Sequence, residues 1–148
     1  MKRRLSEDKE RYYVDSNVFF YAKIMDREYG PSCAEVIKGI HGGRILGATS
    51  TLVALEVANA LRKFGLGREV RDTVDSIFSL RMQVVSLEQS DLRNAINTFH
   101  KYLISPYDCA HLAMMKRLGA QVIISADKDF DKVAEIKRRN PKSFMEDS

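Results

Sequence analysis

The sequence lacks any apolar run long enough to cross a membrane. Its most apolar stretch, residues 52–61, is short and carries Glu56, whereas a membrane span needs about 20 nearly uncharged residues. Residues 1–10 begin with basic side chains but contain no apolar segment, so we expect no secretion signal there. The two cysteines, Cys33 and Cys109, are far apart and form neither a CxxC pair nor a disulfide framework. These absences favour a protein of a reducing cytoplasm with no membrane partner.

Common nucleotide-binding and metal-binding motifs are also missing. Residues 39–43 lack the GK[ST] ending of a phosphate-binding loop, and no GxGxxG follows an expected strand. The three histidines, His41, His100 and His111, are scattered and form no histidine-rich metal site. His111 follows Asp108 by three residues and could share its helix face as a catalytic base. Packing within a helix interface is the simpler interpretation of this histidine.

The composition is that of an ordinary globular domain. The chain has 148 residues, of which 45% are hydrophobic and 30% are charged. This composition excludes general disorder and fits one domain over residues 1–148, with loosely held tails at 1–10 and 140–148. Lysine and arginine number 24 against 20 for aspartate and glutamate, which gives a formal charge of +4. A mild positive excess permits a polyanionic partner such as RNA without requiring one.

Short apolar runs alternate with longer helical patterns along the chain. The runs, which predict strands, are Tyr12–Val14, Ile45–Ala48, Met82–Val85 and Gln121–Ile124. The predicted helices are Asn17–Met25, Ser32–Ile40, Ser50–Lys63, Arg68–Leu80, Ser90–Tyr102 and Pro106–Leu118. Strands separated by crossover helices run parallel. The sequence therefore predicts an α/β sandwich with four parallel strands and helices on both faces.

Two aspartates come after predicted strands. Asp15 directly follows Tyr12–Val14, and Asp127 comes shortly after Gln121–Ile124. An open parallel sheet binds ligands beyond the carboxyl ends of its strands, so both side chains are candidates for chemistry. Taken alone, each aspartate is more simply explained as an Asx turn or the N-cap of the next helix.

Two further acids lie on predicted helices. Glu56 interrupts residues 51–61, which are otherwise apolar on almost all sides, and could form a narrow solvent-exposed stripe with Asn59 and Lys63. Asp108 lies in a first helical turn, where the helix dipole favours a carboxylate whatever its function. Neither acid alone indicates a site.

The four acids together are more informative than any one of them. If all lie on the same rim of one sheet, their like charges raise one another's pKa and destabilise the fold unless a cation neutralises them. Oxygen ligands without clustered histidine or cysteine select a hard divalent ion such as Mg²⁺ or Mn²⁺. Such an ion supports hydrolysis of a phosphate ester.

Four segments, in their order along the chain, resemble motifs of the PIN-domain family. These are Val14–Asn17, Glu56 on a helix, Tyr107–Ala113 and Ile124–Phe130. More narrowly, the chain resembles the small toxin ribonucleases of VapBC type, over nearly its whole length from Tyr12 to Val133. The resemblance implies a three-layer α/β/α sandwich whose central, mostly parallel sheet has four or five strands. It also implies an endoribonuclease that depends on Mg²⁺ or Mn²⁺.

The resemblance assigns roles to particular residues. Its catalytic and metal-binding acids map onto Asp15, Glu56, Asp108 and Asp127. Its polar helper residues map onto Asn17 and Ser125, where Ser125 replaces the threonine that is common in the family. We hypothesise that three aspartates hold one or two ions directly or through water, while Glu56 completes the ligand set or orients the attacking water.

Several acids crowd the last motif. We choose Asp127 as the ligand because it lies nearest the strand end, and we expect Asp129 to cap the following turn. The basic residues of the chain could hold flanking RNA phosphates or could be ordinary solvated residues. Tyr107 could stack on a base or simply pack at a helix start.

The resemblance further implies a homodimer and an inhibitory antitoxin protein that binds near the active site. The segments 19–21 and 32–40 show more apolar surface than one sheet face needs, which either partner would cover. Two other functions remain open, namely a nuclease that processes ribosomal or other structured RNA and an RNA-binding module without turnover. A phosphatase would need an acid where Asn17 stands, and a receiver domain would need an aspartate after its third strand, so both are disfavoured.

Overall fold

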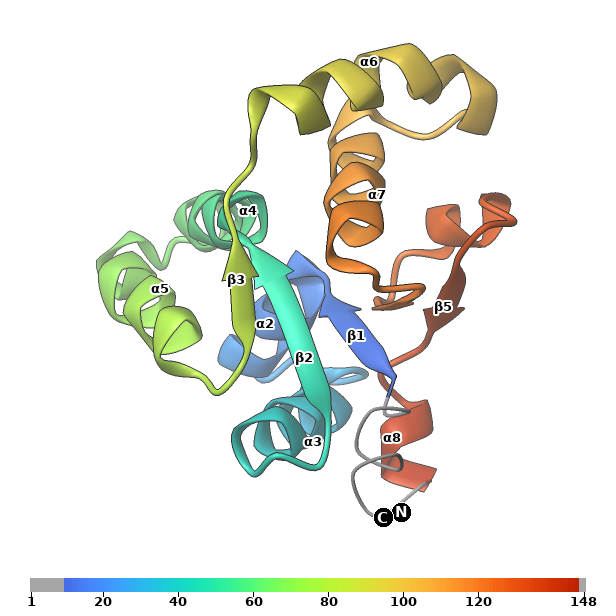
Figure 1. Ribbon diagram of the computed structural model, residues 1–148. Coiled ribbons are helices and arrows are strands. Elements are labelled where there is room, and N and C mark those ends of the chain that lie inside the picture. Colours follow the sequence, from blue (N-terminus) through green and yellow to red (C-terminus); the bar gives the residue numbers. More distant parts are fainter. Residues whose placement is uncertain (1–9, 147–148) are drawn as a thin grey trace.

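The structure is a computed structural model that describes residues 10–146. Its centre is a parallel sheet whose strands are β1 (Arg11–Val14), β2 (Leu46–Ser50), β3 (Gln83–Val85), β4 (Val122–Ile124) and β5 (Lys137–Arg139). The strand order is β3-β2-β1-β4-β5, so β1 lies in the middle (Figure 1). The chain moves outward from β1 to β2 and β3, and later returns to place β4 on the other side of β1. Strand order therefore reverses between β1 and β4, where an open sheet binds ligands.

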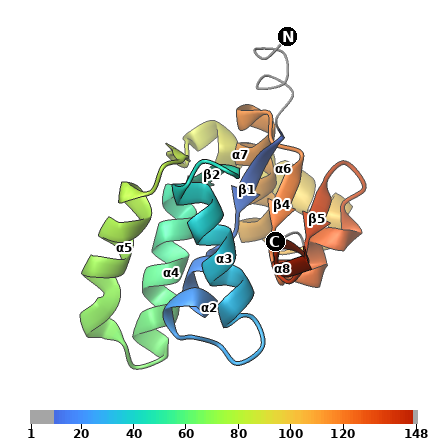
Figure 2. The same ribbon diagram turned by 90° about the horizontal axis from the view of Figure 1, so that it is seen from below.

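Helices cover both faces of this sheet. The helices are α2 (Ser16–Lys23), α3 (Gly30–His41), α4 (Thr51–Lys63), α5 (Val70–Ser79), α6 (Gln89–Tyr102), α7 (Pro106–Leu118) and the short α8 (Ser143–Glu146). Two short 3₁₀ turns are η1 (Gly67–Glu69) and η2 (Lys128–Lys132). Helices α2 to α5 pack together on one side, and α6 pairs with α7 on the other (Figures 1 and 2). The three-layer α/β/α prediction is confirmed.

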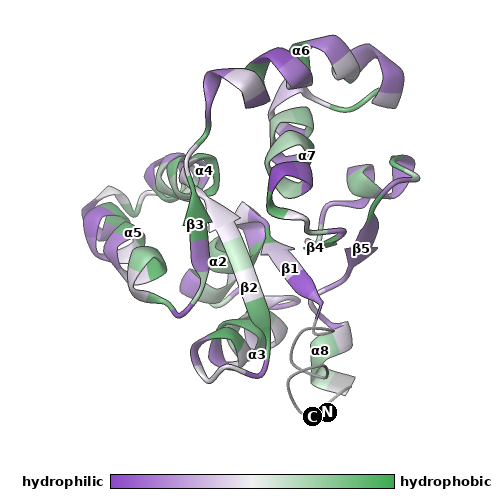
Figure 3. Cartoon of the chain, viewed as in Figure 1, coloured by the Kyte–Doolittle hydropathy of each residue, from purple (hydrophilic) through white to green (hydrophobic). Residues whose placement is uncertain are grey.

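The core lies along the three inner strands. All of β4 is buried, and Tyr13 and Val14 of β1 have no solvent exposure. Strands covered on both faces read as continuous apolar runs, which is why the sequence predicts them. Helix α6 and strand β5 are largely hydrophilic, as Figure 3 shows. Among residues 10–146, no helix is both long and apolar enough to cross a membrane.

The four predicted strands are all present, with shifted boundaries. Strand β2 continues to Ser50, two residues beyond its predicted end, because Thr49 and Ser50 pair with Val84 and Val85 of β3. The fifth strand, β5, agrees with the four or five strands that the family resemblance implies. Its sequence Lys-Arg-Arg carries no apolar signal, and it is paired to β4 only in the folded chain.

The predicted loose tails fall partly outside the described residues, since 1–9 and 147–148 are not among them. Within the described part of the C-terminal tail, residues 143–146 form α8. The Arg139 guanidinium lies 3.8 Å from the centre of the Phe144 ring, and the Tyr12 and Phe144 rings meet edge to face at 6.0 Å. These contacts place α8 beside β1 and β5.

Candidate active site

The first two candidate acids lie at the carboxyl ends of adjacent strands. Asp15 follows β1 and its backbone N–H donates to Ile124 at the end of β4, at 3.1 Å. Its side chain is only 5% exposed and accepts from the Ser16 N–H at 2.8 Å, so Asp15 is also the N-cap of α2. The N-cap explanation is therefore confirmed, and it leaves a role of Asp15 in a functional site open.

Ser125 and Asn17 hold the second carboxylate oxygen of Asp15. The buried Ser125 hydroxyl donates to Asp15 Oδ2 at 2.6 Å, and Asn17 Nδ2 donates to the same oxygen at 3.2 Å. Asn17 Nδ2 also donates to Ser125 Oγ at 3.0 Å, and Asn17 Oδ1 accepts from the Ala126 N–H at 3.1 Å. Every donor to Asp15 in this network is neutral, so the carboxylate is oriented without being neutralised.

Asp127 lies two residues after Ser125, and its N–H donates to the Ser125 hydroxyl at 3.0 Å. The Asp127 side chain caps η2 by accepting from the Asp129 N–H at 2.9 Å. The expectation that Asp129 caps this turn is therefore wrong, because the extended backbone of Asp127 leads into η2 and makes Asp127 the N-cap. Asp129 instead forms an exposed ion pair with Lys132 at 3.3 Å.

Glu56 points inward from α4 and does not lie in a common solvent stripe. Its Oε1 atom is 2.9 Å from Nε2 of His111, and its side chain is 26% exposed. Asn59, one turn further on, is exposed and bonds Arg62 instead. The two histidine nitrogens are both engaged, because Nδ1 of His111 lies 2.7 Å from the Tyr13 hydroxyl.

Asp108 occupies the first turn of α7, which Ser105 caps by accepting its N–H at 3.1 Å. Burial, followed by the charges of Asp15 and Asp127, raises the pKa of Asp108 to about 7. Burial also raises the pKa of Asp15, although His111 and the Ser125 hydroxyl oppose the shift. Burial alone would lower the pKa of His111, but its bond to Glu56 and the charge of Asp15 outweigh burial and raise it.

These acidic side chains lie close to one another at the carboxyl ends of β1 and β4 and form one cluster, which we call the acid pocket. One ligand atom from each of Asp15, Glu56 and His111 lies within 4.8 Å of the others, and the same holds for Asp108, Asp127 and Asp129. The charges of Asp15, Asp127 and Glu56 all raise the pKa of Asp108. Asp108 is therefore near members of both groups, which makes the two groups neighbours. The structure thus brings together the four acids that the sequence singles out, from the ends of β1 and β4 and from α4 and α7.

The donor set fits a hard divalent cation. Within residues 10–146, no lysine or arginine forms an ion pair with Asp15, Glu56, Asp108 or Asp127. The remaining donors are carboxylate oxygens, since both nitrogens of His111 are occupied, and such oxygens suit Mg²⁺ or Mn²⁺. A buried cluster of like charges with raised pKa values is also typical of functional sites.

Sequence reasoning missed Tyr13 and Ser50, which stand behind the pocket. Tyr13 reads as a core residue of β1, and Ser50 reads as the start of α4. Their hydroxyls lie 2.7 Å apart in the fully buried interior. No local pattern could reveal this contact, because the two residues meet only when β1 and β2 pair.

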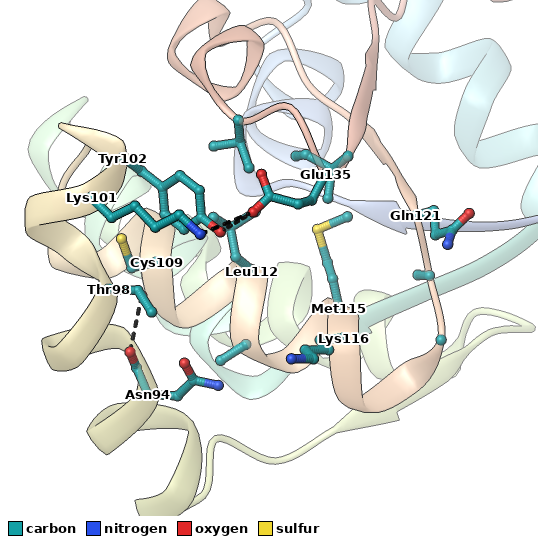
Figure 4. A pocket seen from close by; sticks show the side chains of 15 residues that line it. Asn94, Thr98, Lys101, Tyr102, Cys109, Leu112, Met115, Lys116, Gln121 and Glu135 are labelled. Atoms are coloured by element: carbon teal, nitrogen blue, oxygen red, sulfur yellow. Dashed lines mark hydrogen bonds and ion pairs between the residues drawn. The ribbon is translucent and has the colours of Figure 1, made fainter.

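A separate cavity of about 440 Å³ lies against a different face of α7 (Figure 4). Cys109 and Leu112 line it, and Tyr102 and Lys101 at the end of α6 bond Glu135 across it. None of the four converging acids lines this cavity. It is therefore distinct from the acid pocket.

Comparison with known proteins identifies relatives of this chain. The family model of the PIN domain matches residues 12–136. Among curated proteins, none matches the chain significantly. Solved structures are similar in fold at low sequence identity. The toxin VapC20 of Mycobacterium tuberculosis, which cleaves the sarcin–ricin loop, has a TM-score of 0.70 at 16% identity, covering 83% of this chain and 95% of its own.

Two solved complexes also resemble this chain in fold at low sequence identity. VapBC2 of Rickettsia felis, bound to a DNA fragment of its promoter, has a TM-score of 0.66 at 13% identity, covering 88% of this chain and 98% of that one. A toxin–antitoxin complex of Klebsiella pneumoniae has a TM-score of 0.61 at 14% identity, covering 88% and 97%. At these identities the structural similarity shows a shared fold.

Proposed function

The chain belongs to the PIN domain family, and we propose that it is a metal-dependent endoribonuclease that acts as the toxin of a toxin–antitoxin pair. The observation that carries this proposal is the convergence of Asp15, Glu56, Asp108 and Asp127 on one pocket without a lysine or arginine partner among the described residues. The VapC20 relative, a toxin that cleaves the sarcin–ricin loop, supports RNA as the substrate class. The two free, buried cysteines, Cys33 and Cys109, are consistent with action in a reducing cytoplasm.

Three aspartates would hold the metal. Asp15, Asp108 and Asp127 would bind one or two Mg²⁺ or Mn²⁺ ions, directly or through water, and Glu56 would complete the ligand set or orient the attacking water. A bound divalent ion lowers the pKa of coordinated water and stabilises negative charge on a phosphodiester. Ser125 and Asn17 fix the Asp15 carboxylate, so that it meets the cation without rearranging.

The raised pKa of Asp108 supports cation binding by this pocket. Burial and then the charges of Asp15 and Asp127 raise the pKa of Asp108 to about 7, so these acids repel one another when they are ionised. Binding a divalent cation relieves this repulsion and returns the carboxyl groups to their ionised form. The exposed ring of Tyr107, next to Asp108 in the chain, would stack on an RNA base near the cleaved bond.

We propose that the antitoxin binds near the active site, as the family resemblance implies, and that one of its helices also occupies the cleft between α2, α3 and α5. Hollows of about 270 Å³ and 660 Å³ share Ile37 and Leu80 in their walls, and the smaller one is also lined by Phe19 and Ile77. Such an apolar groove suits an amphipathic helix of a partner. The Klebsiella pneumoniae relative, a toxin–antitoxin complex, supports a partner of this kind.

The homodimer is the second proposed assembly. Leu92 and Ile96 are about half exposed, and their spacing of four residues puts them on one side of α6, which the exposed Leu103 follows directly. A second copy would cover this stripe. Light scattering on the purified chain tests the proposal, and a uniform monomer at micromolar concentration would contradict it.

RNA cleavage tests the enzymatic part of the proposal. Purified protein is incubated with single-stranded RNA in Mg²⁺, in Mn²⁺ and in EDTA, beside the Asp15→Asn variant. We expect cleavage that needs the divalent ion and disappears in the variant. Equal cleavage by the variant, or cleavage in EDTA, would contradict the assignment. Tight RNA binding with no cleavage under any metal would instead indicate a binding module.

Expression in a bacterial host tests the toxin role separately. Production of the wild-type chain alone should arrest growth, whereas the Asp15→Asn variant should not. Normal growth with an active nuclease would favour a role in RNA processing.

A further inference from the structure

A chain of buried hydrogen bonds runs behind Glu56. The Ser50 hydroxyl is 2.7 Å from the Tyr13 hydroxyl, which is 2.7 Å from Nδ1 of His111. Nε2 of His111 is 2.9 Å from Glu56 Oε1. The first three residues are at most 1% exposed, and only Glu56, at 26%, reaches the pocket. This series of hydrogen bonds therefore ends at Glu56, a candidate metal ligand.

The direction of the bond to Glu56 follows from its chemistry. An ionised carboxylate only accepts hydrogen bonds, so the Nε2–H of His111 donates to it in either protonation state of the ring. Burial raises the pKa of Tyr13, so the phenol keeps its proton. With a neutral ring, Nδ1 accepts from the Tyr13 hydroxyl, and the Tyr13 oxygen accepts from Ser50. The Ser50 oxygen itself accepts from the Val53 N–H at 3.2 Å.

This arrangement fixes the histidine ring at both ends. The Tyr13 and His111 rings also touch, with centroids 5.6 Å apart. Rotating the ring would break two buried hydrogen bonds, which is costly in a low-dielectric interior. Ser50 is the N-cap of α4 and Glu56 lies in the middle of that helix, so Tyr13 and His111 brace α4 against β1 and α7. Glu56, a long side chain at the edge of solvent, gains a single orientation from this brace.

We propose that His111, held in place by Tyr13 and Ser50, is a positioning residue that aims the Glu56 carboxylate at the metal-binding pocket. The inference rests on the proposed function, since it gives Glu56 its role in the metal site. His111 itself does not touch substrate, because both of its nitrogens are used by Tyr13 and Glu56. Partners that orient a ligand in this way typically change metal affinity by about 10- to 100-fold when they are removed.

A matched pair of variants separates positioning from packing. In His111→Gln the terminal amide nitrogen takes the place of Nε2 and can still donate to Glu56. In His111→Asn the shorter amide reaches the Tyr13 side and leaves Glu56 without its donor. Both variants remove the buried ring, so their losses of thermal stability should be alike.

The measurement is Mn²⁺ affinity, followed by electron paramagnetic resonance and calorimetry without RNA. We expect His111→Asn to bind Mn²⁺ about 10-fold more weakly than wild type, and His111→Gln to recover most of that loss. Tyr13→Phe, which removes one hydroxyl and keeps the ring, should weaken binding in the same direction by a smaller factor. Tyr13→Phe also serves as the test if the histidine variants do not fold.

A double-mutant cycle shows whether His111 acts through Glu56. In a Glu56→Gln background, both His111→Asn and Tyr13→Phe should cause no further loss of Mn²⁺ affinity. Wild-type affinity in the single variants, or the same fold loss in the Glu56→Gln background, would overturn the proposal. A wild-type protein that binds Mn²⁺ but cleaves no RNA would contradict the nuclease function alone and leave this test readable.

Discussion

Two buried acids of this protein, Asp91 and Asp15, are almost equally shielded from solvent but have opposite surroundings. Asp91 is 4% exposed and pairs with Arg117, whose two nitrogens donate to it at 2.7 and 3.2 Å. It also accepts from the Glu88 N–H at 2.9 Å and so closes the capping box of α6. Asp15 is 5% exposed and, within residues 10–146, accepts hydrogen bonds only from neutral donors.

The difference appears in the proton affinity of the two groups. Burial would raise the pKa of Asp91, but the bonds from Arg117 and Glu88 outweigh burial and lower it. Burial raises the pKa of Asp15, and it also raises that of Asp108 in the same pocket. Asp91, which stabilises the fold, is neutralised by a cationic side chain of the same protein, Arg117. Within residues 10–146, Asp15, Asp108 and Asp127 form no ion pair with a lysine or arginine, so a cation from outside the chain would be needed to neutralise them.

The largest expected effect is that of Asp15→Asn on RNA cleavage. A divalent ion supplies several kcal/mol of transition-state stabilisation, and each 1.4 kcal/mol is tenfold in rate, so we expect a loss of at least about 100-fold. The free energy of unfolding in EDTA should stay the same or rise, because a buried charge without a cation is removed. Single-turnover cleavage assays and urea unfolding measure the two effects. A strongly destabilised variant would show that Asp15 serves the fold as Asp91 does.

The converse variant is Asp91→Asn, which should cost stability and spare catalysis. Losing the charge-assisted bonds to Arg117 should lower the free energy of unfolding by about 2 kcal/mol. Urea unfolding at pH 7 measures this loss, and RNA cleavage at a temperature where the variant is folded provides the control. If the variant were as stable as wild type but inactive, the two regions would not differ as described.

We expect pH to have a smaller, gradual effect on the free energy of unfolding of the metal-free protein. The folded-state pKa of Asp108, about 7, is raised above its unfolded value. Between pH about 4 and 7 the folded protein alone holds this proton, so the free energy of unfolding falls as pH rises and levels off above 7. Asp91, whose pKa is lowered, acts in the opposite sense, since its contribution is lost as pH falls below the unfolded value.

Thermal unfolding in EDTA from pH 5 to 8 measures this slope. The Asp108→Asn variant should reduce this slope and leave the part that comes from Asp15 and His111, whose pKa values are also raised, and saturating Mg²⁺ should reduce it for the wild-type chain by stabilising the ionised carboxylates. A melting temperature that rises steadily over this pH range would contradict the raised pKa of Asp108. The partial exposure of Asp108 weakens the effect through solvent screening.

The smallest effect concerns a polar group with no partner at all. Thr73 of α5 is 8% exposed, and its buried hydroxyl has no hydrogen-bond partner among the described residues 10–146. Replacing it in Thr73→Val should raise the free energy of unfolding by about 1 kcal/mol, because an unsatisfied buried group is removed. Urea unfolding measures the change. A loss of stability would indicate that the hydroxyl is hydrated in the folded protein.

The sequence predicted what depends on local patterns and parallel topology. Once the strands before Asp15 and Asp127 are recognised, their carboxyl ends must lie on one edge of the sheet. The sequence did not predict β5, because Lys137–Arg139 is a polar edge strand. It also misplaced the cap of η2, which depends on the backbone conformation of Asp127.

The bonds that connect remote segments lay beyond sequence reasoning. Tyr13 and His111 are 98 residues apart, and His111 and Glu56 are 55 apart. The sequence around His111 does not distinguish a histidine that only packs in the core from one that orients a metal ligand. Only the paired sheet and the packing of α4 and α7 bring these side chains together.

Anomalous scattering from crystals soaked in Mn²⁺ tests the central claim most directly. We expect a peak in the acid pocket, within coordinating distance of Asp15 and of at least one of Asp108 and Asp127, and no such peak in Asp15→Asn crystals. An empty pocket at saturating Mn²⁺, or a peak bound only by other residues, would contradict the metal site and the nuclease function built on it.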